Sequence, residues 1–303
     1  MKSLVIGYGS IGARHARVLN ELDCDTAVVS GRRIEFPRLY ADLETALHQH
    51  RPDYVVIANS THQHHTTVAE LATRGYTGRV LVEKPLFEQN RPLPDVHFRS
   101  FSVGYNLRFH PVIRRLKELT AGAPVLSVQA HVGQYLPDWR SGADYRQSYS
   151  AKAHLGGGAL RDLSHELDYL TWIFGRWTSL TALGGHVSAL EIDSDDIFSL
   201  LMQTERCPVM TIQMNYLDRT AQRKILVNTH DRTIEADLVA GTITSGAAVE
   251  RFEVLRDDSY RAMHRAALTG DGADLCSLDE GMATLRIIEA AEQANARRQW
   301  VAR

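Results

Sequence analysis

The motif with the clearest chemistry lies near the N-terminus, where Gly7-Tyr8-Gly9-Ser10-Ile11-Gly12 has the spacing G-x-G-x-x-G. It follows a short apolar run and opens a segment with apolar residues at helical spacing, which is the context of a pyrophosphate-binding loop. Gly7 would permit a tight turn, Gly9 would let the backbone approach the anion, and Gly12 would let the helix pack on the strand. Unpaired N–H groups at the helix start would attract the phosphates. The sequence thus predicts a dinucleotide site rather than an ordinary glycine-rich turn.

The end of the second expected strand distinguishes two dinucleotides. It reads Ser30-Gly31-Arg32-Arg33 and has no carboxylate for the hydroxyls of the adenosine ribose. Two guanidiniums there could instead pair with a 2′-phosphate. We therefore expect Ser30, Arg32 and Arg33 to contact the cofactor and NADP(H) to be preferred over NAD(H). The alternative is that both arginines are solvated loop charges.

Three further motifs follow in order along the chain. They are Ala58-Asn59-Ser60-Thr61-His62-Gln63-His64, then Glu83-Lys84-Pro85, and then Gly156-Gly157-Gly158 followed by Asp162, His165 and Asp168. Together with the glycine loop they span more than half of the chain. In composition and order they resemble the glucose–fructose oxidoreductase / inositol dehydrogenase / MocA (Gfo/Idh/MocA) family.

This resemblance implies hydride transfer between nicotinamide and a carbinol or carbonyl carbon, usually of a sugar or cyclitol. It places Lys84 beside the nicotinamide and the reacting oxygen. It also implies cofactor contacts from the third motif and from the Glu-Lys-Pro motif, namely Ser60, Thr61, His62, His64, Glu83 and Lys84. Many family members space the catalytic Asp and His by four residues, whereas Asp162 and His165 are three apart.

Hydride transfer at a carbinol also requires a proton to leave or arrive at the oxygen. A histidine titrates near neutrality, and a lysine can polarise the oxygen or shuttle the proton. Asp162 and His165 would share one face of a helix predicted over 159–174. We therefore expect Lys84, His165 and Asp162 to be catalytic. The alternatives are a solvated lysine, a satisfied interior histidine and an aspartate that caps a helix or forms a surface ion pair.

Polar and aromatic residues beyond the first hundred are candidates for substrate contacts. Arginines suit a carboxylate or phosphate, and aromatic rings suit a sugar. Similar family members act in the assembly of bacterial surface sugars, which suggests a sugar, a nucleotide-activated sugar or a nonulosonic-acid precursor. Alternatively, Arg108 forms a domain-linking ion pair and the loop tryptophan simply packs. The candidates are Asn106, Arg108, Trp139, Arg140, Tyr145 and Tyr149.

The elements that must position these residues change character after Phe109. Before it, continuously apolar strands alternate with helices, which predicts a parallel sheet covered on both faces. After it, runs such as 197–204 alternate with period two, which is typical of antiparallel strands. We expect an α/β protein: a Rossmann domain with a parallel sheet over 1–109, and an α/β domain over 110–303 with a large, mostly antiparallel open sheet. That open sheet favours a homodimer or homotetramer.

Composition narrows the classes of function. The chain has 303 residues and a formal charge of −2, which argues against a dedicated nucleic-acid binder. No run is long enough to span a bilayer, and three scattered cysteines favour a reducing cytoplasm. His62, His64 and His65 lack further ligands in metal spacing, so no metal is expected. Two alternatives stay open: a non-catalytic dinucleotide sensor, and a reductase of a non-sugar substrate, of the dihydrodiol or biliverdin type.

Overall fold

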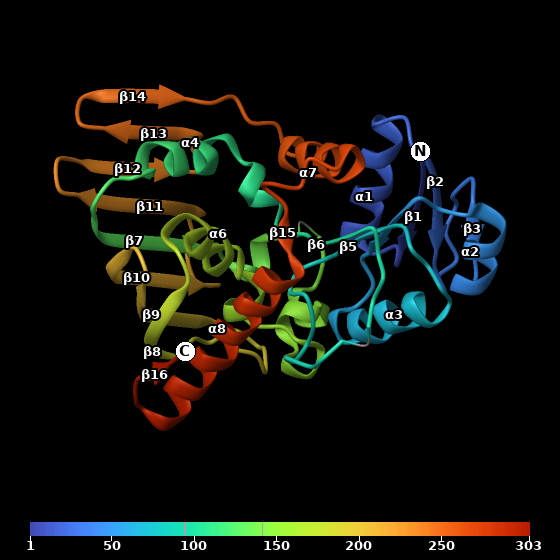
Figure 1. Cartoon of the computed structure of the whole chain (residues 1–303). Coiled ribbons are helices and arrows are strands. Elements are labelled where there is room, and N and C mark those ends of the chain that lie inside the picture. Colours follow the sequence, from blue (N-terminus) through green and yellow to red (C-terminus); the bar gives the residue numbers. More distant parts are fainter. Residues whose placement is uncertain (94, 141) are drawn as a thin grey trace. The chain divides into compact units, whose positions relative to one another are not determined.

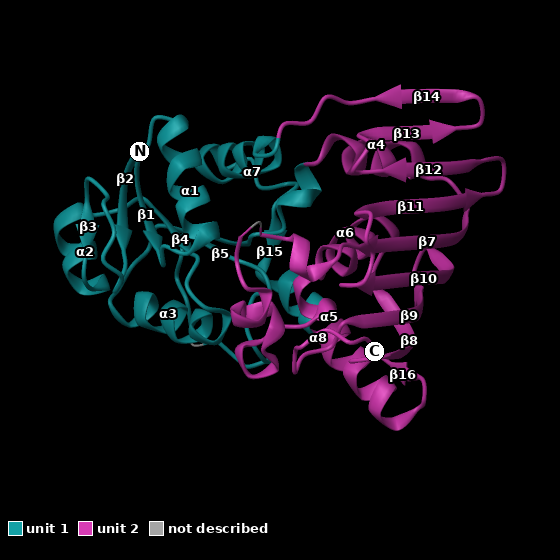
Figure 2. Ribbon diagram, turned by 180° about the vertical axis from the view of Figure 1, so that it is seen from behind, with its two compact units in different colours: residues 1–109, 256–285 teal, residues 110–255, 286–303 magenta. Residues whose placement is uncertain are grey.

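A computed structural model describes residues 1–93, 95–140 and 142–303, which form two compact units. Unit 1 comprises Met1–Phe109 and Arg256–Leu285, and unit 2 comprises His110–Leu255 and Arg286–Arg303 (Figure 2). The first division coincides with the predicted boundary. The prediction of a single boundary is nevertheless wrong, because the segment 256–285 returns to unit 1.

Unit 1 is built on a seven-stranded sheet in the order β15-β6-β5-β4-β1-β2-β3 (Figure 1). Every pair is parallel except β15 with β6. The central strands are apolar along their whole length because helices cover both faces, as predicted. The strands are β1 (Lys2–Ile6), β2 (Asp25–Val29), β3 (Leu39–Tyr40), β4 (Tyr54–Ile57), β5 (Arg79–Val82), β6 (Ser100–Val103) and β15 (Cys276–Ser277).

The helices of unit 1 follow the strands as expected, with one shifted start. Asp42 caps its helix by accepting the Thr45 N–H at 2.8 Å. The third helix begins at Thr61, earlier than its apolar residues alone indicate, so the histidines of the Ala58–His64 motif lie in its first turns. The helices are α1 (Ser10–Glu21), α2 (Leu43–His50), α3 (Thr61–Thr73), the 3₁₀ helix η1 (Asn106–Phe109) and α7 (Asp258–Thr269).

Unit 2 is built on a nine-stranded sheet in the order β14-β13-β12-β11-β7-β10-β9-β8-β16. All neighbours are antiparallel except β7 and β10, so the prediction of a mostly antiparallel sheet is confirmed. The strands are β7 (Val125–Gly133), β8 (Trp177–Gly185), β9 (Ile197–Thr204), β10 (Cys207–Asn215), β11 (Gln222–Thr229), β12 (Thr233–Asp237), β13 (Thr242–Ser245), β14 (Ala248–Arg251) and β16 (Val301–Ala302).

The helix predicted over 159–174 is two helices, α5 (Ala159–Asp162) and α6 (His165–Phe174). Between them the hydrogen-bond ladder tightens, because the Ser164 N–H bonds to the carbonyl of Arg161 rather than to that of the residue before it. Asp162 therefore ends one helix and His165 begins the next, so the prediction that they share the face of one helix is wrong.

The remaining helical segments complete the chain. The residues of the C-terminal helix α8 fall partly in unit 1 and partly in unit 2. The segments are α4 (Pro111–Thr120), η2 (Leu136–Asp138), η3 (Tyr145–Gln147), η4 (Tyr149–Ala151), η5 (Ala153–Leu155) and α8 (Leu278–Arg297).

Candidate functional site

The glycine loop of unit 1 has the crowding that the motif requires. A Cβ on Gly12 would lie 2.1 Å from the carbonyl oxygen of Gly7, and a Cβ on Gly7 would lie 2.6 Å from the backbone of Asn59. A Cβ on Gly9, in contrast, would have no atom within 4 Å apart from Gly9 itself and its two neighbours along the chain. The helix α1 starts there without a side-chain cap. The loop therefore leaves its N–H groups and the side at Gly9 open to an anion, which fits a dinucleotide pyrophosphate.

The segment after β2 has no carboxylate and exposes its two arginines. The Arg32 N–H donates to Ser30 Oγ at 3.1 Å, which shapes the turn. Within the part of the chain that the structure describes, neither Arg32 nor Arg33 forms an ion pair. Tyr8 of the glycine loop packs edge-on against Phe36, with the ring centres 5.6 Å apart. Both guanidiniums are thus available to a ligand at the carboxyl edge of the sheet.

The third motif separates into exposed and buried residues. Ser60 and His62 are exposed and Thr61 is half-buried, at the start of α3. His64 is only 1 % exposed. Its Nδ1 lies 3.2 Å and 3.1 Å from the carbonyl oxygens of Pro85 and Leu86, and burial lowers its pKa. The geometry gives His64 a structural role: it holds the segment that follows Lys84.

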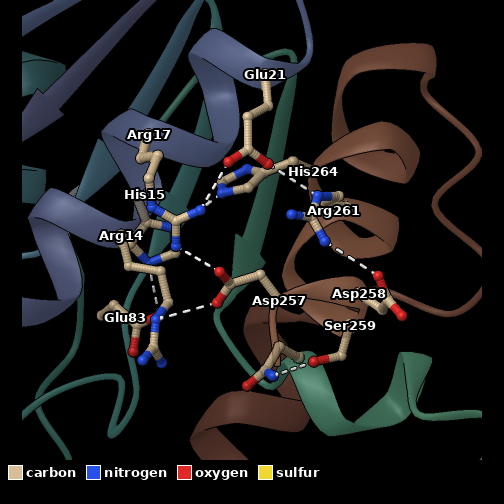
Figure 3. Close-up of polar contacts among 11 residues, drawn as sticks. Arg14, His15, Arg17, Glu21, Glu83, Asp257, Asp258, Ser259, Arg261 and His264 are labelled. Carbon is tan, nitrogen blue, oxygen red and sulfur yellow. Dashed lines mark hydrogen bonds and ion pairs between the residues drawn. The ribbon is translucent and has the colours of Figure 1, made fainter. Parts of the chain in front are cut away.

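The Glu-Lys-Pro motif ends β5 at the carboxyl edge of the parallel sheet, and its Lys84–Pro85 bond is cis. Lys84 is half-buried. Glu83 is 5 % exposed and accepts hydrogen bonds from the Lys84 backbone N–H, at 3.1 Å, and from the ring of His15, at 2.8 Å. Figure 3 shows that His15 contacts His264 in turn, a partner that sequence patterns did not reveal.

Two expected substrate contacts are engaged inside unit 1. The Asn106 amide donates to Ser259 Oγ at 2.7 Å, and both residues are buried. The Arg108 side chain is 2 % exposed and pairs with Glu280 at 3.0 Å. Arg108 therefore forms an ion pair within unit 1 rather than the domain-linking pair of the alternative interpretation, and Asn106 ties η1 to α7.

Unit 2 presents the Asp162 carboxylate between two phenols. The hydroxyl of Tyr216 donates to Oδ2 at 2.6 Å, and the hydroxyl of Tyr149 donates to Oδ1. Burial, together with the charge of Asp162, raises the pKa of both phenols well above the ordinary value, so each keeps its proton and donates. Tyr149, predicted to touch substrate, therefore orients Asp162, and Tyr216 was missed because it lies far along the chain, at the end of β10.

Three of the predicted substrate residues line one cavity of about 310 Å³ in unit 2: Trp139, Arg140 and Tyr145. Trp139 packs edge-on against Tyr216, with ring centres 5.1 Å apart. The cavity wall thus contacts one of the two tyrosines that donate to Asp162. Arg140 is exposed and has no ion-pair partner among residues 1–93, 95–140 and 142–303. The cavity therefore combines aromatic surface with one available guanidinium.

The start of α6 is fixed by a buried ion pair. His165 is 9 % exposed and the adjacent Glu166 is fully buried. Glu166 accepts two hydrogen bonds from Arg223, at 2.7 Å and 3.1 Å, and one from the Tyr169 hydroxyl at 2.8 Å. Burial, with the charge of Arg223 adding to it, lowers the pKa of His110 to about 4. This network sets the position from which His165 projects.

The glycine triplet lets two segments pack against α5. A Cβ on Gly157 would lie 2.2 Å from the carbonyl oxygen of Tyr149, and a Cβ on Gly158 would lie 2.1 Å from Asp195 Oδ1. Asp195 accepts the Leu160 N–H at 2.9 Å. The glycines therefore allow both Tyr149 and Asp195 to approach the short helix that carries Asp162.

Asp195 predicts a pH dependence of stability. Burial raises its pKa from 3.8 to about 6. The folded protein then holds this proton more tightly than the unfolded chain between about pH 4 and 6, so stability falls as pH rises through that window. We expect the unmodified protein to lose on the order of 1–3 kcal/mol of unfolding free energy across this window through Asp195, and Asp195→Asn not to show this part of the loss. Urea unfolding of both proteins at pH 4 and pH 7 measures the difference, and an equal stability gap at both pH values would contradict it.

No helix among the described residues is both long and apolar enough to cross a bilayer. Within the same residues, no group of three or more His, Cys, Asp or Glu side chains could hold a metal ion.

Comparison with known structures supports the fold. GenD2 from gentamicin A biosynthesis, in complex with NAD, is 22 % identical with a TM-score of 0.80, over 100 % of this chain and 96 % of that one. Levoglucosan dehydrogenase in complex with NADH is 15 % identical with a TM-score of 0.84, over 100 % and 98 %. An oxidoreductase from Agrobacterium radiobacter, in complex with NAD+, L-tartaric acid and magnesium, is 18 % identical with a TM-score of 0.80, over 100 % and 98 %.

Sequence comparison identifies both halves of the chain. No curated protein matches the sequence. Residues 1–93 match the oxidoreductase family with an NAD-binding Rossmann fold, and residues 113–243 match the GFO/IDH/MocA C-terminal domain. With the two folds described above, these matches confirm the predicted family and the nicotinamide dinucleotide as its cofactor type: the chain belongs to the Gfo/Idh/MocA family of oxidoreductases.

Proposed function

We propose that this oxidoreductase transfers a hydride between NADP(H) and a carbinol or carbonyl carbon of a sugar or sugar derivative. Bound at the glycine loop, the dinucleotide would supply or accept the hydride. The observation that carries the proposal is that a dinucleotide-binding unit with Lys84 at its sheet edge belongs to the same chain as an oriented Asp162 and a nearby His165. A sensor that only binds the dinucleotide needs none of these proton-transfer groups.

Two residues would supply the proton chemistry. Lys84 would polarise the substrate oxygen or exchange its proton, and His165 would act as the base or acid. Asp162, whose two oxygens accept from Tyr149 and Tyr216, would support the charge that forms on His165 during transfer.

The cavity in unit 2 supports a class of substrate. Three arginines come into question for binding an anion: Arg108, Arg140 and the nearby Arg146. Arg108 pairs with Glu280, and Arg146 pairs with Asp144 and Glu191. Arg140 alone lacks such a partner within the described ranges. Aromatic walls with one guanidinium suit a sugar that carries a single carboxylate or phosphate. This favours an acidic or nucleotide-activated sugar, as expected for surface-polysaccharide precursors.

A turnover screen tests the proposal. Neutral sugars, cyclitols, sugar acids and nucleotide sugars are offered with NADP+ and NAD+, and with NADPH and NADH for the keto forms. We expect turnover with a sugar acid or nucleotide sugar. Fluorescence of the bound reduced dinucleotide, with no turnover of any polyol or keto sugar, would instead support the sensor, and turnover of only dihydrodiols or biliverdin would support the non-sugar reductase.

Cofactor preference is tested at Arg32 and Arg33. Charge-assisted bonds to a 2′-phosphate contribute about 1.5–3 kcal/mol, so the double substitution to alanine is expected to weaken NADPH binding roughly 10- to 100-fold and leave NADH binding unchanged. Arg51→Ala is the matched control, because this exposed arginine precedes β4 at the opposite edge of the sheet. Kd values come from dinucleotide fluorescence. Tighter binding of NADH than NADPH by the unmodified protein would overturn the preference.

The outer face of the large sheet supports the expected homo-oligomer. It carries a shallow hollow of about 840 Å³ along strands β7 to β12, with Leu183 60 % and Leu201 38 % exposed. Exposed leucines on an open sheet favour burial against a second copy. Light scattering after gel filtration tests this, and a Leu183→Lys, Leu201→Lys variant is expected to shift a dimer or tetramer towards monomer.

A further inference from the structure

Four buried side chains of unit 1 form a continuous line of hydrogen bonds, the Tyr54–Glu83 chain. The Tyr54 hydroxyl lies 3.0 Å from His264 Nδ1, and His264 Nε2 lies 2.8 Å from His15 Nδ1. His15 Nε2 lies 2.8 Å from Glu83 Oε1 (Figure 3). Glu83 Oε2 accepts the backbone N–H of Lys84 at 3.1 Å. The chain therefore ends at the residue that we propose to be catalytic.

All four side chains of the Tyr54–Glu83 chain are buried. Tyr54, His15 and His264 are 0 % exposed, and Glu83 is 5 % exposed. They come from four separate elements: β4, α1, α7 and the end of β5. Where water is excluded, each polar atom depends on its neighbour in the chain for its hydrogen bond.

The protonation states give the chain a direction. Burial raises the pKa of Tyr54 well above its ordinary value, so the phenol keeps its proton, and in the proposed arrangement it donates this proton to His264 Nδ1. Burial, and secondarily the adjacent His15, lowers the pKa of His264 well below its ordinary value, so this ring is neutral and has one N–H. Because Nδ1 accepts, that N–H is on Nε2 and donates to His15 Nδ1. His15 Nε2 then donates to Glu83.

Glu83 is held as a carboxylate at the end of this line. Burial opposes its charge, but the hydrogen bond from His15, the charge of Lys84 and the Lys84 N–H together lower the pKa of its carboxyl. One oxygen faces His15 and the other faces the Lys84 backbone. The orientation of the carboxylate is thus set from the His264 end.

We propose that His15 and His264 are positioning residues for Lys84: through the Tyr54–Glu83 chain they fix the Glu83 carboxylate, and this carboxylate fixes the backbone and the charge environment of the lysine. The proposal rests on the proposed function, in which Lys84 acts on the substrate oxygen. Unlike residues that only fill the core, the two histidines are therefore expected to affect turnover, and to do so through Lys84.

The test combines a spectroscopic readout with turnover. The chain has five lysines (Lys2, Lys84, Lys117, Lys152 and Lys224), so the ¹³C signals of the reductively dimethylated protein can be assigned by substituting Lys84 with arginine. ¹⁵N signals of the imidazoles report the tautomers. We expect Nε2–H forms of both His15 and His264 at pH 7. An Nδ1–H or doubly protonated His264 would contradict the proposed direction of the hydrogen bonds in the Tyr54–Glu83 chain.

Substitutions at His264 test the link to Lys84. We expect His264→Leu to shift the Lys84 signal and lower kcat roughly 10- to 100-fold, with KM and the dinucleotide Kd nearly unchanged. His264→Gln, which can still accept and donate, should largely restore both. His50→Gln is the matched control, because His50 is 1 % exposed and lies 3.0 Å from the Ser3 carbonyl oxygen, outside the chain.

Further outcomes separate this proposal from the proposed function. If His264→Leu does not fold, Tyr54→Phe removes only one hydroxyl and should shift the Lys84 signal in the same direction by less. A wild-type Lys84 signal and kcat in both variants would overturn the positioning role. If the Lys84 signal responds but no substrate turns over, the link between the histidines and Lys84 stands and the proposed function fails.

Discussion

Replacing Lys84 with alanine is expected to lower kcat by roughly 10²- to 10⁴-fold and to leave the dinucleotide Kd within about twofold of wild type. The reason is that the ammonium would act on the substrate oxygen, whereas the pyrophosphate would be held by the glycine loop. Steady-state kinetics with the substrate from the screen, and titration with NADPH, measure the two quantities. Equal losses in kcat and in dinucleotide affinity would point instead to a structural lysine.

A second substitution at the same position separates two roles of the lysine. Arginine keeps the positive charge but does not release its proton near neutral pH. Lys84→Arg should therefore retain part of the activity if the lysine only polarises the oxygen, and should be as poor as alanine if it moves the proton. Lys2→Ala, at an exposed position at the start of β1, is the control and should have full activity. Wild-type turnover in Lys84→Ala would remove the lysine from the mechanism.

The parts of the fold that were predictable are those encoded locally. The strand, glycine loop and helix over 2–21 are contiguous, so apolar periodicity and glycine spacing suffice to place them. The same holds for the Asp42 cap and for β9, whose alternation of buried and exposed residues reproduces its strand bounds. The family motifs add that the Rossmann fold comes first and the fold with the antiparallel sheet second. Neither apolar periodicity nor glycine spacing indicates this order by itself.

The parts that were not predictable depend on partners distant in sequence. Arg108 reads equally well as an anion clamp or as an ion pair, and only its contact with Glu280, 172 residues away, decides. His15 and His264 are 249 residues apart, and the segment that carries His264 gave no signal that it returns to unit 1. One signal was present: His15 lies on the apolar side of its helix between Ile11 and Leu19.

The broken helix at Asp162 illustrates a different limit. Apolar spacing over 159–174 is continuous, so it predicts one helix, yet the backbone changes hydrogen-bond partner at Ser164. The tyrosines that bind Asp162 come from outside this segment. Long-range contacts to the carboxylate therefore accompany a break that local propensity does not encode.

Two of the three glycines of the dinucleotide loop, Gly9 and Gly12, are expected to respond in opposite ways to substitution by alanine. At Gly12 a Cβ would meet the Gly7 carbonyl oxygen at 2.1 Å, and backbone cannot easily yield, so Gly12→Ala should lower the free energy of unfolding by about 1–3 kcal/mol. At Gly9 the angles φ −80° and ψ −168° are open to alanine and no neighbour is crowded. The free energy of unfolding of the Gly9→Ala variant should therefore differ from that of wild type by less than about 0.5 kcal/mol.

Gly9→Ala should nevertheless weaken dinucleotide binding roughly tenfold or more, because its methyl group would occupy the space through which the pyrophosphate approaches the backbone. Urea unfolding without ligand and fluorescence titration with NADPH separate stability from binding in both variants. The contrast matters more than either value: a stable Gly9→Ala that binds NADPH like wild type would mean that the open side of the loop does not face the phosphates. The dinucleotide would then have to lie elsewhere, and the proposed roles of Arg32, Arg33 and Lys84 would fall with it.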